Sequence, residues 1–528
     1  MVPNPTHNDT SREYEETQPD RTKLKLNLGP NANQYTEVRS FRTSLPQVLA
    51  TMAQSMLLLS LGMLISVPTV VIAALHNAPT GLSMNDKQAS WFAGILLIMQ
   101  PLGSVLSGVI QDILGRKRCM LMVNLPQLIG WILIYYAKSV EVLFIAAVTM
   151  GFSIGFMEAP TLSYVGEISQ PHLRGTLASF TSVYIGTGNL IMYLMGTFTD
   201  WRSAAAMSTA VPVIAFVAIL QVPESPVWLL MKGRRDEARA SLAWLRGWVK
   251  QESVTGEFRG MEAHCEASKL NSPVSSPTTP PLSYVPVPSS ENGALVIQDY
   301  KPTFSEKMRD LVRPEMLRPL RLVVFFFLFL HCAACNGSKP YLIKIFKRIG
   351  IPIEAFAATV IAASSQILGS FVCMGSVRKL GKRGLSLISI SACSVITLSL
   401  GTYTMLHEHR GVNLSWLPLL LFSLLYFFTN FGIGVIPWTL LAEVFPSRGR
   451  GVGGGVSAAM YYVWFFLVSK TFLDLENLIQ LYGVFFFYSF LGFCGFLFLY
   501  IYQPETEGRK LEEVEVLFQS KKKQTNSV

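Results

Sequence analysis

Two short segments of this 528-residue chain place a carboxylate and a guanidinium group at the same spacing. Glu167 is followed by Arg174, and far downstream Glu443 is followed by Arg450 after the same interval, with a glycine directly after each arginine. Carboxylates and guanidinium groups form charge-assisted hydrogen bonds with each other. Both segments are therefore candidates for ion pairing, and their equal spacing indicates equivalent places in the fold.

Two further motifs recur in the same order around these segments. Gly115-Arg-Lys-Arg returns as Gly381-Lys-Arg-Gly, and Pro223-Glu-Ser returns as Pro504-Glu-Thr. The copies of all three motifs lie at nearly the same separation along the chain. The sequence therefore predicts two related halves of matching length and order.

The composition is typical of a membrane protein. Hydrophobic residues make up 50%, charged residues only 15%, and the mean hydropathy is +0.37, whereas about a quarter of the residues in soluble domains are charged. Twelve apolar runs are long enough to span a bilayer. They begin near Val48, Trp91, Leu121, Val142, Leu177 and Ala204, and near Leu322, Ala355, Leu385, Trp416, Val452 and Leu481. We expect an all-α membrane protein with two six-helix bundles.

The remaining segments are polar. We expect a disordered cytosolic tail over residues 1–42, a first bundle over 43–222, a cytosolic linker with short helices over 223–320, a second bundle over 321–503 and a cytosolic tail over 504–528. The tail at the start is poor in apolar residues and cannot bury a core. In the linker, the stretch 232–246 has an apolar side and is expected to lie at the membrane surface, and 271–290 is a Pro/Ser-rich spacer.

The basic residues set the orientation. Arg116-Lys-Arg and Arg378-Lys between apolar runs, and Lys521-Lys-Lys after the last run, all fall on one side. The positive-inside rule assigns this side to the cytosol together with both termini. Because the net charge of +10 is distributed in this way, it indicates topology and not nucleic-acid binding. Asn413-Leu-Ser is a glycosylation sequon on the outer side, close to the next span.

Two segments match enzyme motifs in letters only. Gly151-Phe-Ser-Ile-Gly155 fits a nucleophile elbow but lies within an apolar run, where small residues permit close helix packing. Gly449-Arg-Gly-Val-Gly-Gly454 fits a dinucleotide fingerprint but has no strand before it. Cys332 and Cys335 are three residues apart in an apolar run, so we expect packing and not a redox or metal pair. No cofactor, metal site or enzymatic activity is predicted.

The motif set resembles the sugar porter family of the major facilitator superfamily. The segment from Asp112 through Gly115 and Arg116 is similar to the superfamily signature, and Pro437-Trp438 and the repeated motifs above complete the likeness, which covers about Leu45 to Phe518. Within the family the chain most resembles insect facilitated trehalose transporters, through Gln47-Val-Leu-Ala-Thr, Ser90-Trp91 and Ile345-Phe-Lys.

The resemblance implies a gate of charged side chains at the cytosolic helix ends, which pair across the bundles when the pathway is closed inside. Its members would be Asp112, Arg116, Glu167, Arg174, Glu443 and Arg450. The alternative is that these charges only set topology, although topology requires no matched acids. Where the family has an acid in the second half, this chain has Arg378, so the second half of the gate is expected to be unbalanced.

The resemblance also implies a sugar site within the membrane, made of His331, Asn336, Gln366, Asn430, Trp438, Ser182 and Tyr461. Several differ from the family: His331 replaces a glutamine, and Ser182 and Tyr461 stand where amides are usual. His331 has three interpretations, namely a neutral histidine bonded within the bundle, a substrate contact, or a proton sensor.

These features favour a facilitative carrier of a neutral sugar, such as trehalose or a hexose, in the plasma membrane. Proton-coupled relatives have an acid in the first span and an arginine where this chain has Ala147, and the first span here has no acid. The lost amides leave open a sensor that binds sugar without transporting it, or a carrier of another small organic solute. The expected partners are a small sugar and the bilayer; the oligomeric state is not predicted.

Overall fold

The computed structural model describes residues 41–270, 314–445 and 450–508, with Val514 and Phe518. The tail predicted over 1–42 lies outside the described residues except for its last two positions, which already belong to the first helix. The Pro/Ser-rich spacer and most of the C-terminal tail also lie outside them. Within the described residues the elements are helices, accompanied by one isolated bridge between His76 and Met84.

The first half of the chain crosses the bundle six times. Its helices are α1 (Phe41–Leu75), α2 (Asp86–Ile98) continued by α3 (Gln100–Leu114), α4 (Arg116–Tyr136), α5 (Val140–Ile168), α6 (Pro171–Phe198), and α7 (Trp201–Ser208) continued by α8 (Ala210–Gln221). Polar caps define where apolar segments begin: Asn85 forms a capping box with Gln88 at the start of α2, and Asp200 accepts from the first backbone N–H groups of α7.

The second half repeats this plan. Its helices are α13 (Pro314–Ala333), the 3₁₀ turn η2 (Asn336–Tyr341) and α14 (Leu342–Ile349), then α15 (Ala355–Arg410), α16 (Leu417–Phe431) with α17 (Ile436–Glu443), α18 (Arg450–Lys470) and α19 (Phe472–Tyr502). α15 is two helices, because Gly381 has a φ of 70° and turns the chain. Among the described residues nine segments are long and apolar enough to cross a membrane; dividing α15 at Gly381 and adding α6 and α18 confirms the twelve predicted spans.

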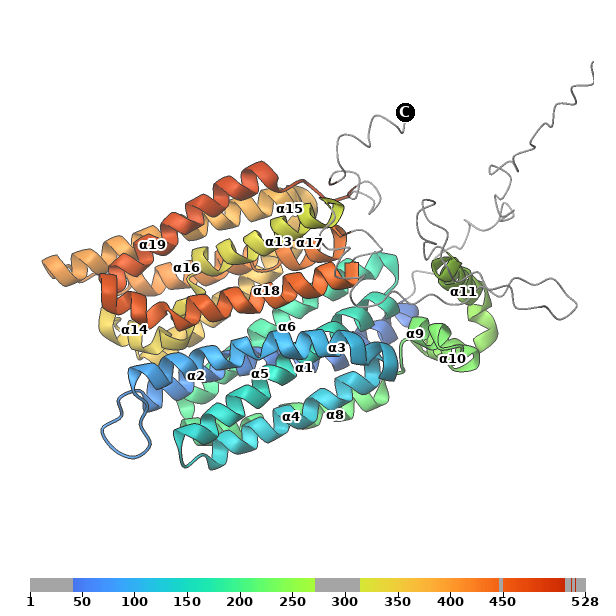
Figure 1. Cartoon of the computed structure of the whole chain (residues 1–528), viewed down its shortest axis with the longest axis horizontal. Helices are drawn as coiled ribbons and strands as arrows, with labels where there is room; N and C mark the ends of the chain where they lie inside the picture. The colour runs from blue at the N-terminus through green and yellow to red at the C-terminus, as the bar shows by residue number, and fades with distance from the viewer. Residues whose placement is uncertain (1–40, 271–313, 446–449, 509–513, 515–517, 519–528) are drawn as a thin grey trace, which may run out of the picture.

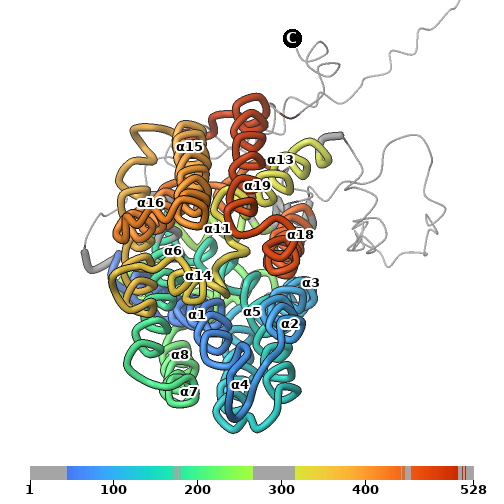
Figure 2. Tube along the Cα trace, turned by 90° about the vertical axis from the view of Figure 1, so that its left-hand side faces the viewer, coloured from blue at the N-terminus to red at the C-terminus, as the bar shows by residue number. Residues whose placement is uncertain are grey.

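The two halves form two bundles that lie side by side. Figure 1 shows the helices of the first half below those of the second, and Figure 2 shows the same division along the bundles. The bundles meet where α6 packs against α15 and where α2 and α3 pack against α18. Within the first bundle, a Cβ on Gly151 or Gly155 would come within 2.2 or 1.8 Å of a carbonyl oxygen of α2 or α3. The packing interpretation of these two glycines is confirmed.

Short linker helices project from one end of the molecule, which we call the linker end (Figure 1). They are α9 (Pro226–Met231), α10 (Arg235–Leu245), η1 (Gln251–Val254) and α11 (Thr255–Leu270). The apolar side of α10 is buried: Leu242 packs with Trp228 and Phe258 in a small core of these helices, and Leu245 packs against the first bundle. The predicted membrane-surface helix is therefore wrong, because neighbouring protein covers its apolar side.

Candidate functional site

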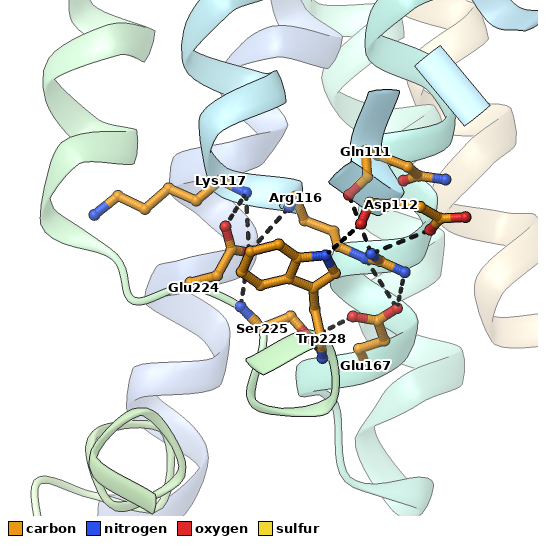
Figure 3. Close-up of polar contacts among 8 residues, drawn as sticks. All are labelled: Gln111, Asp112, Arg116, Lys117, Glu167, Glu224, Ser225 and Trp228. Carbon is orange, nitrogen blue, oxygen red and sulfur yellow. Dashed lines mark hydrogen bonds and ion pairs between the residues drawn. The ribbon is translucent and has the colours of Figure 1, made fainter. Parts of the chain in front are cut away.

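A cluster of charged side chains joins three helix ends of the first bundle at the linker end (Figure 3). Arg116, at the start of α4, is buried, and its guanidinium group lies 2.9 Å from Oε1 of Glu167 at the end of α5. The same group lies 3.4 Å from Oδ1 of Asp112 at the end of α3. Three of the six predicted gate residues are therefore in contact, all within one bundle.

Glu224 binds the N-terminus of α4 and thereby positions Arg116 in this cluster. Its carboxylate accepts hydrogen bonds from the backbone N–H groups of Arg116 at 3.0 Å and Lys117 at 3.1 Å. A carboxylate at a helix N-terminus satisfies unpaired N–H groups and interacts favourably with the helix dipole. Gly115 makes this approach possible, because its φ is 99° and a Cβ there would come within 2.3 Å of Glu224. Ser225 donates its hydroxyl to Glu167 and completes the connection.

The second bundle contains the same cluster built from the repeated motifs. Glu505 accepts from the backbone N–H groups of Lys382 and Arg383, each at 3.0 Å, directly after the turn at Gly381. The side chain of Lys382 donates to Glu443 at 2.5 Å, and Thr506 donates to the same carboxylate at 2.9 Å. Lysine therefore replaces arginine at the centre, and the two glutamates and the hydroxyl donor of the first cluster have counterparts here.

The second cluster does have a further acid. Glu507 lies 3.2 Å from the ammonium group of Lys382, whereas Arg378, at the position of the family acid, is exposed on α15. The expectation of an unbalanced cluster is wrong, because the segment after α19 returns a carboxylate that the sequence position of Arg378 lacks.

Sequence reasoning missed part of both clusters. Glu224 and Ser225 in the first, and Glu505 and Thr506 in the second, were recognised only as repeat markers. The signal was present in their repetition as Pro-Glu-Ser and Pro-Glu-Thr, since a carboxylate that recurs at an equivalent place in two halves has an equivalent partner in each.

The expected pairing across the bundles is not seen among the described side chains, where every ion pair lies within one half of the chain. The side chains of Arg174, in the first turn of α6, and Arg450, at the start of α18, lie outside the described part of the structure. Their predicted role as gate residues remains a prediction.

Hydrogen bonds between described residues join the two bundles, three of them to a backbone carbonyl or a side-chain amide. Thr69 donates to the backbone carbonyl of Lys339 at 2.9 Å, and Ser90 donates to that of Lys470 at 2.8 Å. The third, from Asn189 to Gln366, is 3.2 Å long. All three lie in the middle of the bundles or toward the end opposite the linker helices, so this conformation is held together at the far end.

The predicted sugar-site residues of the seventh span lie in a broken helix. α13 ends at Ala333, and Cys335 has a left-handed backbone with a φ of 50° before η2 begins. Cys332 therefore lies in α13, and Cys335 lies beyond its end. Both are buried and unpaired, and no cluster of three metal-ligating side chains occurs among the described residues. Broken membrane helices free polar groups near a substrate site.

His331 is fully buried and uses both ring nitrogens within the protein. Nδ1 lies 2.9 Å from the side-chain nitrogen of Asn336, and Nε2 lies 3.1 Å from the carbonyl oxygen of Tyr461. An amide N–H₂ can only donate and a carbonyl can only accept. The ring is therefore neutral with its hydrogen on Nε2, which agrees with the interpretation of a histidine bonded within the bundle.

Aromatic rings surround this histidine. Its ring stacks on Phe465 with centroids 4.8 Å apart and lies 4.6 Å from Tyr461. Trp438 joins the cluster at 4.9 Å from Tyr461, and Phe327 lies 5.0 Å from Tyr461 and 5.1 Å from Trp438. Four predicted site residues, His331, Asn336, Trp438 and Tyr461, are therefore brought together on the second bundle.

Gln366 belongs to a separate chain of hydrogen bonds between the bundles. Ser66 donates to Oδ1 of Asn189 at 2.9 Å, and the amide nitrogen of Asn189 donates to Oε1 of Gln366. Ser182 lies on α6, the helix that packs against α15, and Asn430 donates to the carbonyl of Tyr426 on its own helix at 3.2 Å. The structure therefore connects Gln366 to the first bundle, and no described hydrogen bond from Ser182 or Asn430 crosses between the bundles.

Two charged residues within the spans escaped the sequence analysis. Glu158, on α5, is 8% exposed; Ser104 donates to its Oε2 at 3.0 Å, and its Oε1 is buried without a partner. Tyr462 of the opposite bundle interacts with this carboxyl group. Lys339 lies in η2. The available signal was a charged residue within an apolar run, because charged residues are costly in a membrane and usually functional.

The sequon residue Asn413 is exposed before α16 and accepts a hydrogen bond from Ser415 at 2.9 Å. Its exposed position is compatible with the predicted glycosylation, which remains a prediction.

Comparison with known proteins identifies relatives along nearly the whole chain. Residues 47–518 match the family model described as "Sugar (and other) transporter". The facilitated trehalose transporter Tret1 of Polypedilum vanderplanki is 28% identical over 91% of this chain and 90% of its own length, and that of Apis mellifera ligustica is 27% identical over 94% and 93%.

Solved structures share the fold. The major facilitator superfamily proton:xylose symporter XylE, bound to 6-bromo-6-deoxy-D-glucose, superposes with a TM-score of 0.69 at 20% identity, over 90% of this chain and all of that one. The inward open conformation of XylE from E. coli gives a TM-score of 0.67 at 19% identity, over 89% and 99%. At these identities the likeness concerns the fold.

Proposed function

Because the chain belongs to the Sugar (and other) transporter family, a family of membrane transporters and not of enzymes, we propose that it is a facilitative carrier of sugars that works by alternating access. The observation that carries this proposal is the pair of equivalent charged clusters, one centred on Arg116 and the other on Lys382, at the linker end of two equivalent bundles. Trehalose and hexoses are the first substrates to test, because the relatives named above are trehalose transporters.

The carrier lies in the plasma membrane with both termini in the cytosol. The linker end faces the cytosol, because Arg116, Lys117, Lys382 and Arg383 all lie there and cytosolic loops carry the excess of basic residues. The hydrogen bonds between Thr69 and Lys339 and between Ser90 and Lys470 then close the outer side. In the opposite state these bonds part, and the cytosolic helix ends, including Arg174 and Arg450, come together.

Each charged cluster fixes the ends of neighbouring helices relative to one another within its bundle. Arg116 and Glu167 hold α4 against α5, and Lys382 and Glu443 hold the second half of α15 against α17. Each bundle can therefore move as a rigid body. A change of a few kcal/mol in the free-energy difference between the two conformations is enough to shift their populations. Substrate binds where the bundles meet, with Gln366 and Asn336 as hydrogen-bonding partners, Trp438 as a wall, and His331, Asn430, Ser182 and Tyr461 around them.

Uptake of radiolabelled trehalose and hexoses by a cell line without its own sugar carriers tests the proposal. We expect saturable uptake that an uncoupler leaves intact and that Gln366→Ala reduces at least tenfold, because an amide that binds substrate hydroxyls is lost. Asn477→Ala, on the exposed side of α19, is a matched control that should leave uptake unchanged. Uptake abolished by the uncoupler would contradict a passive mechanism.

A second candidate is a sensor that binds sugar without moving it. It is favoured by the bonded state of His331, whose ring nitrogens are both occupied by Asn336 and Tyr461 at the place where the family has a sugar-binding amide. Purified protein in liposomes separates the two functions. Sugar binding with no flux above that of empty vesicles would favour the sensor, and flux would favour the carrier.

A further inference from the structure

Lys339 lies in the broken segment of the seventh pass, between α13 and α14. In a 3₁₀ turn, residues three apart lie one above the other, so Lys339 is on the same side of η2 as Asn336. Its backbone carbonyl accepts the hydrogen bond from Thr69 of the first bundle. The residue therefore lies at the junction of the bundles and next to an amide of the proposed sugar site.

The second amide of that site is connected to the same contact through α1 and α6. Thr69 follows Ser66 by one turn of α1, and Ser66 leads through Asn189 to Gln366. The backbone of Lys339 therefore contacts the turn of α1 from which hydrogen bonds lead to Gln366.

The ammonium group of Lys339 has no counterion among the described residues. No described ion pair or hydrogen bond involves it, and the contact found is with the face of Tyr426, whose ring centroid is 5.6 Å away. Glu158, the one described carboxylate well inside the spans, is bonded to Ser104. At the outer surface, Asp86 and Glu476 are paired with His76 and Arg348.

An unpaired ammonium group inside a membrane protein is costly. The residue Lys339 is partly exposed, and its ammonium group lies near enough to the ring of His331 in the proposed sugar site to interact with it electrostatically. A neutral sugar offers only hydroxyl groups, which the amides of Asn336 and Gln366 already suit. A carboxylate or phosphate would supply the missing counterion and form a charge-assisted hydrogen bond.

We propose that Lys339 selects sugars that carry an anionic substituent, a carboxylate or a phosphate, over their neutral parents. This rests on the proposed function as a sugar carrier and narrows its substrate class. A charge-assisted hydrogen bond gives roughly ten- to hundredfold tighter binding in favour of the anionic sugar.

Four probes with the same pyranose ring test the proposal: glucose, glucuronamide, glucuronate and glucose 6-phosphate. The first two are neutral, glucuronamide being nearly isosteric with glucuronate, and the last two distinguish a carboxylate from a phosphate. Binding and flux are measured on the full chain in liposomes. We expect glucuronate or glucose 6-phosphate to bind at least tenfold more tightly than glucose and glucuronamide, and the tighter of the two identifies the anionic group.

The variants separate selection from folding. Lys339→Gln should remove the preference, so that neutral and anionic probes bind equally, whereas Lys339→Arg should retain it. Lys344→Gln, on the exposed side of α14, is the matched control and should change neither. Thermal unfolding in detergent checks that each variant is folded.

Three results would overturn the proposal. One is equal binding of neutral and anionic probes by the unaltered protein, and another is a preference that survives in Lys339→Gln. The third is loss of the preference in Glu158→Gln to the same extent, which would mean that Lys339 pairs with Glu158 in another conformation. Failure of the carrier function is distinct, because it appears as absence of flux for every probe even where anions bind preferentially.

Discussion

Glu505 holds the start of the second half of α15 as Glu224 holds the start of α4. Each carboxylate accepts from two consecutive backbone N–H groups that follow a glycine with positive φ. These acids come from segments that follow the last span of each half, so each bundle is closed on itself at the linker end. The closure explains why the motifs recur at similar offsets, since all members of one cluster must meet in one place.

Alanine at Gly381 is expected to destabilise the protein strongly. The residue has a φ of 70°, and a Cβ would come within 2.3 Å of Glu505. Gly233→Ala is the matched control, because Gly233 has a φ of 76° but no atom near its Cβ position. Positive φ alone costs about 1 kcal/mol, so Gly381→Ala should lower the unfolding free energy by clearly more than Gly233→Ala. Equal losses in thermal unfolding would contradict the contact with Glu505.

Glu507 is expected to pair with Lys382 in place of the family acid at position 378, where this chain has an arginine. Glu507→Gln removes one of two carboxylates at Lys382 and should slow uptake and lower stability by up to about 1 kcal/mol. Arg378→Asp then provides an acid one helical turn before Lys382, as Asp112 does before Arg116. The double variant should recover uptake. If its uptake is no faster than that of Glu507→Gln, Glu507 does not compensate for the acid missing at position 378.

Alanine at His331 leaves a donor of Asn336 and the carbonyl of Tyr461 without partners and opens a cavity beside Phe465. Losses of this kind cost about 2–5 kcal/mol, so we expect a marked fall in the unfolding temperature. His409→Ala, on the exposed end of α15, should have little effect. A small effect of both variants would show that the bonded histidine contributes little to the bundle.

The contact between Asn189 and Gln366 is expected to stabilise the conformation in which the bundles are joined at the far end. A double-mutant cycle with alanine at both positions should give a coupling of about 0.5–1.5 kcal/mol in thermal unfolding. The control cycle pairs Asn189 with Asn430, which the structure does not join by a hydrogen bond, and should be additive. Additivity in both cycles would contradict the contact across the bundles.

The fold followed from the sequence because its signals are local. Apolar runs of membrane-spanning length and basic clusters between them fix the number and direction of the passes, and the repeated Glu167 and Glu443 segments fix the division into halves. Glu507 could not be foreseen as the partner of Lys382, because that contact depends on how the chain turns after α19. The burial of Leu242 was missed for the same reason, since no periodicity tells which surface covers an apolar helix face.

The membrane-interior site was only partly predictable. His331 was recognised as unusual, but its bonding to Asn336 and Tyr461 depends on the helix break at Cys335. Asn336-Gly337 directly after it was the available turn signal, and it was interpreted only as part of the family's substrate motif. Lys339 and Glu158 were visible as charges within apolar runs, and they were passed over because the search followed family positions.

The central claim, passive alternating-access transport, is tested most directly by sugar accumulation in liposomes that contain only the purified protein. The account predicts saturable entry of a sugar until the inside and outside concentrations are equal, at the same final level with and without an imposed pH gradient. Accumulation above the outside concentration when the pH gradient is applied, or entry no faster than into protein-free vesicles, would contradict it.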